Sequence, residues 1–384
     1  MNTFKGYPRA DGTYGVRNLV AVISTADNSN FIARKAAQAV KGTVPLCPCF
    51  GRGEIGEDME QHIRTMAGMG SNPNVHSAVV VSLEPVIANK IAERIRKTGK
   101  DVEVFSIDEC KDTICCVEQA VRAAEKMVIR ASMEERVEVS LEHLMLGVEC
   151  GGSDTTSGIV SNPALGYVAD KLVELGGTVI MSETTEWMGA ENNLLRRAVS
   201  KQVGEKITKA VQWYEDYIQS IGVDLNGFNP APDNIRGGLS TIEEKALGSI
   251  KKGGSKTIED VLSYARRPQG NGLYLMDAPT GGVENTTGLS AAGCQLILFS
   301  TGKGNPMGNP VAPTVKVTGN TRTAKTAAFN IDVDLSAVLT EELPLSRAGE
   351  ELSAQLVQYA NGKMTTSEVL DEVEIAVSRI GFTV

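Results

Sequence analysis

Runs of apolar residues alternate with amphipathic segments along the whole chain. In the first third, near-continuous apolar runs predict buried strands at 19–24, 77–83 and 102–107, with a short strand at 42–46. Segments with helical periodicity follow these runs, at 30–40, 58–69, 85–97 and 113–131. Strands that are apolar on both faces and alternate with helices are typical of a parallel sheet covered by helices on both sides.

The same alternation resumes after the charged segment 132–142, which predicts a join between two domains. Further strands are predicted at 144–148, 178–182, 272–276 and 295–300, and helices at 163–175, 192–221 and 347–361. The segment 222–238, rich in Asn, Pro and Gly, predicts a long ordered loop. We therefore predict an α/β protein of two consecutive α/β domains with mostly parallel sheets covered by helices. Residues 1–140 would form a Rossmann-like domain and residues 141–384 the catalytic domain.

Composition narrows the classes of function. The net charge is −9 and the basic residues are scattered, which argues against a nucleic-acid partner. An apolar run long enough for a membrane span is absent from the sequence, and the first residues lack a signal core, so we expect no membrane association and a cytoplasmic location. The seven cysteines match neither a disulfide framework nor zinc spacing. The three histidines lie outside the motifs described below, which leaves Lys, Glu, Asp or Cys as the catalytic base.

Candidate chemistry is densest after the predicted strand 144–148, in the stretch GVECGGSD. Glu149 and Cys150 offer metal ligands or acid–base groups, and Ser153 and Asp154 offer polar contacts to a ligand. Ligands bind at the carboxyl ends of the strands in open α/β sheets. A plainer interpretation is equally open, with Cys150 as a small buried hydrophobe and the two glycines as a turn.

Two later segments add acids and a base. Glu183 follows the predicted strand 178–182 and is the strongest acidic candidate there, because Glu186 and Glu191 also fit solvated acids at a helix start. Glu243 and Lys245 lie in a segment that contains a helix capping box, which alone could explain its pattern.

A glycine-rich loop follows the predicted strand 295–300. Thr301 and Lys303 in this loop suit an anion cradle built from backbone N–H groups, and Cys294 precedes the strand.

Three arginines lie in or near turns of the first domain. Arg9 and Arg17 precede the strand 19–24, and arginine suits bidentate binding of a carboxylate. Arg52 lies in Gly51–Gly56, whose G-x-G-x-x-G pattern invites a dinucleotide-binding interpretation. Two features argue against a dinucleotide site. The pattern follows the second predicted strand rather than the first, and Glu84 lies too many residues after the glycines to be the ribose-binding acid. An anion-binding loop with Arg52 as its charge is favoured over a dinucleotide site, and a simple tight turn is equally open.

Five blocks, in order, resemble the altronate/galactarate dehydratase family: RADGTYGVRN, GVECGGSDTTSGIVSNPALG, SETTEWMGAE, GGLSTIEEKALG and SAAGCQLILFSTGKGNPMG. The resemblance runs from Arg9 to about Gly362. It implies a lyase that eliminates water across the α and β carbons of a sugar acid to give a 2-keto-3-deoxy acid. It also implies a divalent metal ion, for which Fe(II) is the first candidate and Mn or Mg are alternatives. A sibling group, the large (beta) subunit of (2R)-sulfolactate sulfo-lyase, releases sulfite and pyruvate instead.

Two departures from the family pattern matter. Fused family members carry a small β-rich domain of roughly one hundred residues ahead of this region, so we expect a separate small subunit and an oligomer. Family members also tend to carry Gly-Cys where this chain has Gly51-Arg52, and Gly-Cys-Glu where it has Ser82-Leu83-Glu84. A gained arginine would suit a more anionic leaving group such as a sulfonate.

The expected chemistry is proton removal beside a carboxylate, with the resulting charge stabilised by a metal ion. The expected substrate is a small anionic hydroxy acid, and the predicted site residues fall into three groups. The metal ligands are Glu149, Cys150 and Cys294; the catalytic groups are Glu183, Glu243 and Lys245; the substrate-binding groups are Arg9, Arg17, Arg52, Ser153, Asp154, Thr301 and Lys303. Two other classes stay open: a non-catalytic sugar-acid-binding subunit, and a nicotinamide oxidoreductase that depends on GRGEIG alone.

Overall fold

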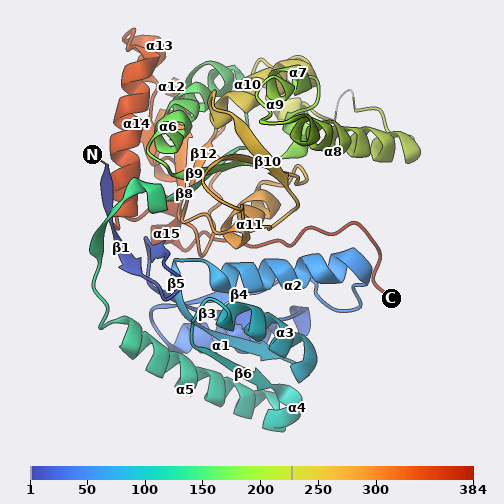
Figure 1. Cartoon of the computed structure of the whole chain (residues 1–384), viewed down its shortest axis with the longest axis vertical. Coiled ribbons are helices and arrows are strands. Elements are labelled where there is room, and N and C mark those ends of the chain that lie inside the picture. The colour runs from blue at the N-terminus through green and yellow to red at the C-terminus, as the bar shows by residue number, and fades with distance from the viewer. Residues whose placement is uncertain (1, 226–227) are drawn as a thin grey trace.

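Two parallel sheets, one above the other, organise the chain (Figure 1). The computed structural model describes residues 2–225 and 228–384. The smaller sheet comes from the first part of the chain and the larger sheet from the second. The predicted α/β class, with mostly parallel sheets covered by helices, is confirmed.

The smaller sheet has four parallel strands in the order β4-β3-β5-β6. Its elements are β3 (Leu19–Ser24), α1 (Asn30–Ala39), β4 (Thr43–Leu46), α2 (Gly56–Ser71), β5 (Val75–Ser82), α3 (Pro85–Arg96), β6 (Val102–Ser106), α4 (Ile107–Cys110) and α5 (Thr113–Ala131). Apolar side chains of α1 and α5 cover one face, and those of α2 and α3 cover the other. The strands and helices predicted here lie within two residues of those observed.

The larger sheet has seven parallel strands in the order β10-β11-β9-β8-β12-β13-β14. They are β8 (Met145–Cys150), β9 (Thr178–Met181), β10 (Ile258–Leu262), β11 (Gly272–Met276), β12 (Leu296–Ser300), β13 (Thr314–Thr318) and β14 (Val333–Asp334). The chain builds outward from β8 through β9 and then returns to the opposite side of β8 with β12. Ligands in open α/β sheets bind where the strand order reverses in this way.

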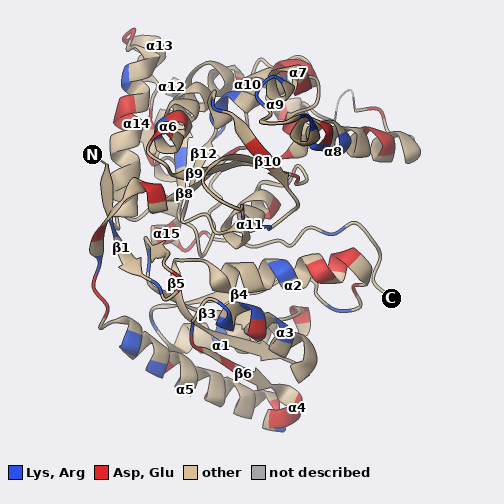
Figure 2. Cartoon of the chain, viewed as in Figure 1, with Lys and Arg blue, Asp and Glu red and all other residues tan. Residues whose placement is uncertain are grey.

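Helices cover both faces of the larger sheet. The longer ones are α6 (Asn162–Glu174), α8 (Lys201–Ser220), α10 (Ile242–Ser249), α11 (Gly282–Ala292) and α14 (Leu345–Ala360), and the shorter ones are α7 (Glu191–Leu195), α9 (Pro232–Arg236), α12 (Thr321–Thr326), α13 (Ala337–Thr340) and α15 (Thr366–Leu370). Charged residues of both signs are interspersed on the outer helices (Figure 2). Within the described ranges, every helix is too short or too polar to span a bilayer.

One prediction about the second part of the chain needs correction. The segment 222–238 is not loop throughout, because α9 begins at Pro232, where proline suits the first turn of a helix. Residues 226 and 227 of that segment lie outside the described part. The stretch 192–221 is largely helical as predicted, and it contains two helices, α7 and α8.

A small antiparallel sheet ties the start of the chain to the predicted domain join. Strand β1 (Thr3–Pro8) pairs with β2 (Tyr14–Gly15) on one side and with β7 (Val137–Ser140) on the other. The charged segment 132–142 therefore contains a strand rather than a free linker. The division of the chain at residue 140 stays a prediction.

The two large sheets share a hydrophobic core. Helix α2 packs against α11, and a Cβ added to Gly68 would collide with the backbone of Ala291. The Asn72 side-chain amide donates to the carbonyls of Ser290 and Cys294, at 2.8 and 2.9 Å. Buried amide bonds of this kind fix one sheet relative to the other, since each lost partner would leave a buried polar group unpaired.

Arg9 and Arg17 also connect distant parts of the chain. Arg9 donates to the Pro73 carbonyl at 2.7 Å and to Glu134 at 2.9 Å. Arg17 makes a two-pronged contact with Glu368, at 2.7 and 3.0 Å, and also donates to carbonyls near the end of α14. Both guanidinium groups are occupied by protein acceptors, so the structure does not support the prediction that they bind substrate.

Replacing Arg17 with alanine should therefore destabilise the fold. The partly buried Glu368 carboxylate would lose its charged partner and the carbonyls of Tyr359 and Lys363 would lose a donor, which costs about 2–4 kcal/mol in the free energy of unfolding. The matched control is Arg122→Ala, which breaks an exposed helical pair with Glu118 and should cost less than about 1 kcal/mol. Denaturant unfolding of both variants checks this. Equal destabilisation would show that Arg17 is not a structural tether.

Candidate active site

Three glutamates meet at the carboxyl ends of β8 and β9. Glu149 lies on β8, and Glu183 and Glu186 lie in the turn that follows β9. One carboxylate oxygen from each residue lies within 4.8 Å of the other two, and all three side chains are buried. We call these three residues the glutamate cluster.

The backbone at Glu183 is held in an uncommon conformation. Its φ is 71°, in the left-handed region that non-glycine residues seldom adopt. The next residue is fixed by a hydrogen bond from the Thr184 N–H to the Ala278 carbonyl, at 2.9 Å. The Thr185 hydroxyl donates to the Glu183 carboxylate at 3.3 Å. The surrounding turn thus holds a strained residue with its carboxylate in the cluster, a feature often found at functional sites.

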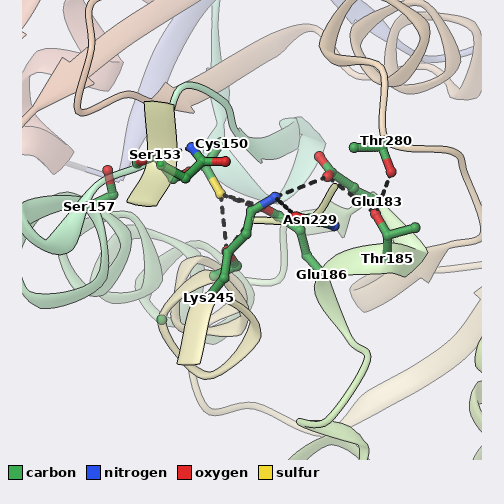
Figure 3. Close-up of polar contacts among 12 residues, drawn as sticks. Cys150, Ser153, Ser157, Glu183, Thr185, Glu186, Asn229, Lys245 and Thr280 are labelled. Carbon is green, nitrogen blue, oxygen red and sulfur yellow. Dashed lines mark hydrogen bonds and ion pairs between the residues drawn. The ribbon is translucent and has the colours of Figure 1, made fainter. Parts of the chain in front are cut away.

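Two lysines from the segment after α9 supply the opposite charge, and Figure 3 shows Lys245 beside Glu183 and Glu186. Lys252 is buried, with its ammonium group against the Glu186 carboxylate and 3.3 Å from the Cys150 sulfur. Lys245 on α10 lies 4.0 Å from Glu183 and 3.9 Å from Glu186, and it donates to the Asn229 side chain at 2.9 Å.

The charged groups of this site differ in the direction in which their pKa values are shifted. Burial, together with the charges of the neighbouring glutamates, raises the pKa of Glu183 well above its ordinary value. Burial alone would also raise the pKa of Glu186, but Lys252 and Lys245 together hold it below the ordinary value. Burial would lower the pKa of Lys252, but Cys150 and Glu186 raise it well above the usual range. Glu186 and Lys252 therefore stay charged, and Glu183 is the carboxylate with the highest proton affinity of this group.

Cys150 acts as a hydrogen-bond donor within the cluster. Its thiol lies 3.1 and 3.2 Å from the two oxygens of Glu186. Burial raises the pKa of this thiol to about 12, with Glu186 as a second cause. In this arrangement the thiol orients Glu186 rather than serving as a thiolate.

The glutamate cluster fits a divalent cation. One oxygen of Glu149 accepts from the Ser182 hydroxyl at 2.6 Å, while the other is buried with no hydrogen-bond partner among the described residues. A buried carboxylate oxygen without a partner is costly unless a proton or cation meets it. Carboxylate oxygens are the ligands that hard cations such as Mg²⁺ and Mn²⁺ prefer, and they also bind iron.

A small cavity of about 250 Å³, lined by polar and apolar residues, adjoins the cluster. Lys245 and Ser249 line it from one side, and Ser153 and Asn162 from the other. The Ser153 hydroxyl and the Asn162 side-chain carbonyl are buried without hydrogen-bond partners within the described residues. The cavity thus offers a cation and unpaired polar groups to a small, polar, anionic ligand.

Comparisons with known proteins agree with this geometry. Residues 141–383 match the model of the D-galactarate/altronate dehydratase C-terminal domain, and residues 6–132 match that of the second domain of the same enzymes. The (2R)-sulfolactate sulfo-lyase subunit beta of Chromohalobacter salexigens is 39% identical over 98% of this chain and 97% of that protein. The altronate dehydratase of Bacillus subtilis is 32% identical over 99% of this chain and 78% of its own length. The galactarate dehydratase (L-threo-forming) of Escherichia coli is 31% identical over 95% of this chain and 74% of that protein.

The chain belongs to the D-galactarate/altronate dehydratase family. Both the family and the lyase class predicted from the sequence are confirmed, since the relatives are dehydratases and a sulfo-lyase.

The structure of this family member brings together five of the predicted site residues: Glu149, Cys150, Ser153, Glu183 and Lys245. They come from three segments that are far apart in the sequence. Their common position follows from β8 and β9 being neighbours and from α10 packing beside the turn after β9.

Three other predicted residues lie nearby but shape loops. Asp154 lines the cavity, but its carboxylate accepts from the Ser157 N–H at 3.0 Å and from the Asn320 amide at 2.6 Å. The Thr301 hydroxyl accepts from the N–H groups of its own loop. Lys303 is exposed beside Gly152. These residues fix the loops after β8 and β12, whose strands flank the reversal of strand order.

The remaining predicted residues lie away from the cluster. Cys294 precedes β12, at the end of the sheet opposite Cys150, and is buried in the core between the sheets, so it does not fit the predicted role of metal ligand. Glu243 is exposed and hydrogen-bonded to Thr241, which lowers the pKa of its carboxyl, so it is poorly placed to take a proton from a buried substrate. Arg52 lines a different pocket.

Two central residues were missed from the sequence. Glu186 also fitted a solvated acid at a helix start, and Lys252 was not among the predicted site residues. The only sequence feature that pointed to Glu186 was its position three residues after Glu183, in the block SETTEWMGAE. Their burial depends on how 245–252 packs against the turn after β9, which sequence pattern alone does not reveal.

Neutralising Lys252 should destabilise the protein. In Lys252→Met the buried Glu186 would keep its charge without its nearest cation, at a cost of about 3–5 kcal/mol in the free energy of unfolding. Lys251→Met is the matched control, because Lys251 is exposed, and it should change stability by less than about 0.5 kcal/mol. Thermal and urea unfolding of both variants measure the difference, and similar curves would contradict the assigned pairing.

Proposed function

We propose that this chain catalyses a metal-assisted α,β-elimination on a small hydroxy-acid anion at the glutamate cluster. The observation that carries the proposal is the burial of three carboxylates beside two ammonium groups, next to a small cavity. Burying so many charges is costly, and titratable groups with displaced pKa values are concentrated at functional sites.

Glu149 and Glu186 would hold the divalent cation, which supplies a Lewis acid for the charge that develops on the substrate, and Glu183 would stay free to move a proton. Fe(II) is the first candidate, as in the family resemblance, and Mn or Mg are alternatives that suit the all-oxygen ligand set.

The chain's own groups would bind the substrate and move its proton. Lys245 remains an ammonium group, because Glu186 and Glu183 raise its pKa against the effect of burial, and it would attract the substrate carboxylate. The Ser153 hydroxyl would bind a polar substituent, since it has no other partner among the described residues. The Glu183 carboxylate would accept the proton next to the substrate carboxylate, because its proton affinity is raised.

Two leaving groups are candidates. Sulfite is favoured by the identity of 39% to a sulfo-lyase subunit along nearly the full length of both chains. Water is favoured by the matches to the altronate and galactarate dehydratases, which are less similar. The partner in either case would be a separate small subunit, because the sulfo-lyase relative is itself a subunit beta, and we propose that the two assemble into an oligomer.

Sulfolactate, altronate and galactarate should therefore be tested as substrates, with and without an added small subunit and with Fe(II), Mn²⁺ or Mg²⁺. Formation of a keto acid together with sulfite identifies a sulfo-lyase, and a keto acid alone identifies a dehydratase. If the substrates bind but yield no keto acid under any of these conditions, the chain is a binding subunit and the proposal is wrong.

On the active substrate, Glu183→Gln should lower kcat by about 10²–10⁴-fold, the contribution of a general base. The control Glu191→Gln changes an acid outside the cluster, which accepts from the Gly189 N–H, and should stay within about twofold of the parent. Full activity of the Glu183 variant would remove this residue from the mechanism.

Metal binding should depend on the carboxylates and not on Cys294. Glu149→Gln is expected to weaken Mn²⁺ binding by at least about tenfold, because one charged ligand is lost. Cys294→Ala, a small change in the core between the sheets, should leave Mn²⁺ affinity unchanged. Titration followed by electron paramagnetic resonance measures both, and the reverse pattern would restore Cys294 as a ligand.

A further inference from the structure

Asn162, the first residue of α6, lines the cavity beside the glutamate cluster. The residue is 1% exposed. Its side-chain Nδ2 donates to the Gly248 carbonyl at 3.2 Å and to the Cys150 sulfur at 3.9 Å. Its Oδ1 is buried and has no hydrogen-bond partner among residues 2–225 and 228–384. This oxygen is therefore the one open end of an otherwise bonded side chain.

The orientation of this amide follows from its neighbours. The Gly248 carbonyl can only accept, and the Cys150 thiol donates its own proton to Glu186, so the sulfur is an acceptor here as well. Only the NH₂ group of Asn162 can face these two acceptors, which leaves Oδ1 as the free atom.

The backbone holds Asn162 in place through an uncommon turn. A π-helical turn, Ser157–Ser161, comes directly before it, and the Asn162 N–H donates to the Ser157 carbonyl five residues back. A Cβ added to Gly248 would lie 3.1 Å from the Cα of Gly158, so this turn and α10 pack closely with no side chain between them. π-helical turns are often found at functional sites. Here the turn and its contact with α10 fix Asn162 at the cavity.

A buried amide oxygen without a donor selects the chemistry of its ligand. Oδ1 can only accept, so it disfavours carboxylate and sulfonate oxygens and favours an O–H group. Lys245 and Ser153, which also line the cavity, can donate and therefore suit the anionic groups. Sulfolactate, altronate and galactarate share one donor, the hydroxyl on the carbon next to the carboxylate.

We propose that Asn162 is a specificity-determining residue that accepts a hydrogen bond from this hydroxyl through Oδ1. This role rests on the proposed function, because it requires the substrate to occupy the cavity. It holds for either leaving group: the elimination takes the proton of this carbon and the group on the neighbouring carbon, and the hydroxyl stays in place. A substrate without the hydroxyl leaves Oδ1 unpaired, which is costly in a buried site.

Calorimetric titration of the full chain with malate and with succinate, in the presence of Mn²⁺, tests this role. The two acids differ only in the hydroxyl. Malate resembles sulfolactate with a carboxylate in place of the sulfonate, and because that carboxylate is a poor leaving group, binding is measured without turnover. One enantiomer of malate should bind at least about tenfold more tightly than succinate, the value of one buried hydrogen bond.

Variants of Asn162 separate its contribution from that of the metal, because a preference that arises from the metal is common to parent and variant. In Asn162→Leu the side chain keeps its approximate size but loses the acceptor, so the ratio of malate to succinate affinity should fall about tenfold. Asn162→Ser, a shorter side chain, should lower the ratio in the same way, and thermal unfolding shows which variants are folded. Ser153→Ala is the matched control, because it removes another unpaired group of the same cavity and should weaken both ligands alike.

The proposal is overturned if malate binds no more tightly than succinate, if the folded Asn162 variants keep the parent's ratio, or if Ser153→Ala lowers the ratio as much as they do. The outcome is separable from that of the elimination. A hydroxyl preference without keto-acid formation leaves the role of Asn162 standing and removes the proposed function, and keto-acid formation without the preference does the reverse.

Discussion

Electrostatic compensation of the three buried glutamates is the constraint on which the rest of the site depends. Their carboxylate oxygens lie within 4.8 Å of one another in the protein interior, where isolated charges are strongly disfavoured. Lys252 and Lys245 offset part of this cost by direct contact, and a bound cation would offset more. The cost explains why so much of the surrounding structure is fixed: the thiol of Cys150, the hydroxyl of Ser249 and the strained backbone of Glu183 all act on the cluster.

The parallel sheet makes this convergence possible. Glu149 and Glu183 are distant in sequence, but β8 and β9 are paired in register, so both strands end at the same edge. The two lysines lie on α10 and in the turn after it, and these segments pack against α6 and the turn after β9. No single segment could bring three acids and two bases together, because a short peptide cannot bury charged groups on its own.

The part of this arrangement that depends on local pattern could be predicted from the sequence. The strands β3, β8 and β11 are apolar on both faces, so their apolar runs in the sequence predicted them. Helix α11 was not predicted, because Gly, Thr, Ser and Ala give it no amphipathic stripe; it is buried on nearly every side. Strand β13 was hidden by the buried Lys316 in its centre. Glu186 and Cys294 were misjudged for the same reason: burial is set by long-range packing, and neither a helix-start acid nor a cysteine before a strand reveals which end of the sheet it occupies.

The conspicuous residues of the sequence thus divide by whether their polar groups are already satisfied. Arg17 and Asp154 were predicted to bind a ligand, but the polar groups of each form hydrogen bonds with other parts of the protein. Glu149 and Ser153 were predicted as site residues too, and each retains a buried polar atom without a partner in the described residues. Because an unpaired buried polar group is costly, such atoms persist where a ligand, a cation or a proton completes them. The unpaired oxygens of Glu149 and Ser153 lie at the carboxyl edge of the larger sheet, beside the point where the strand order reverses, which is why this physical argument leads to a ligand there.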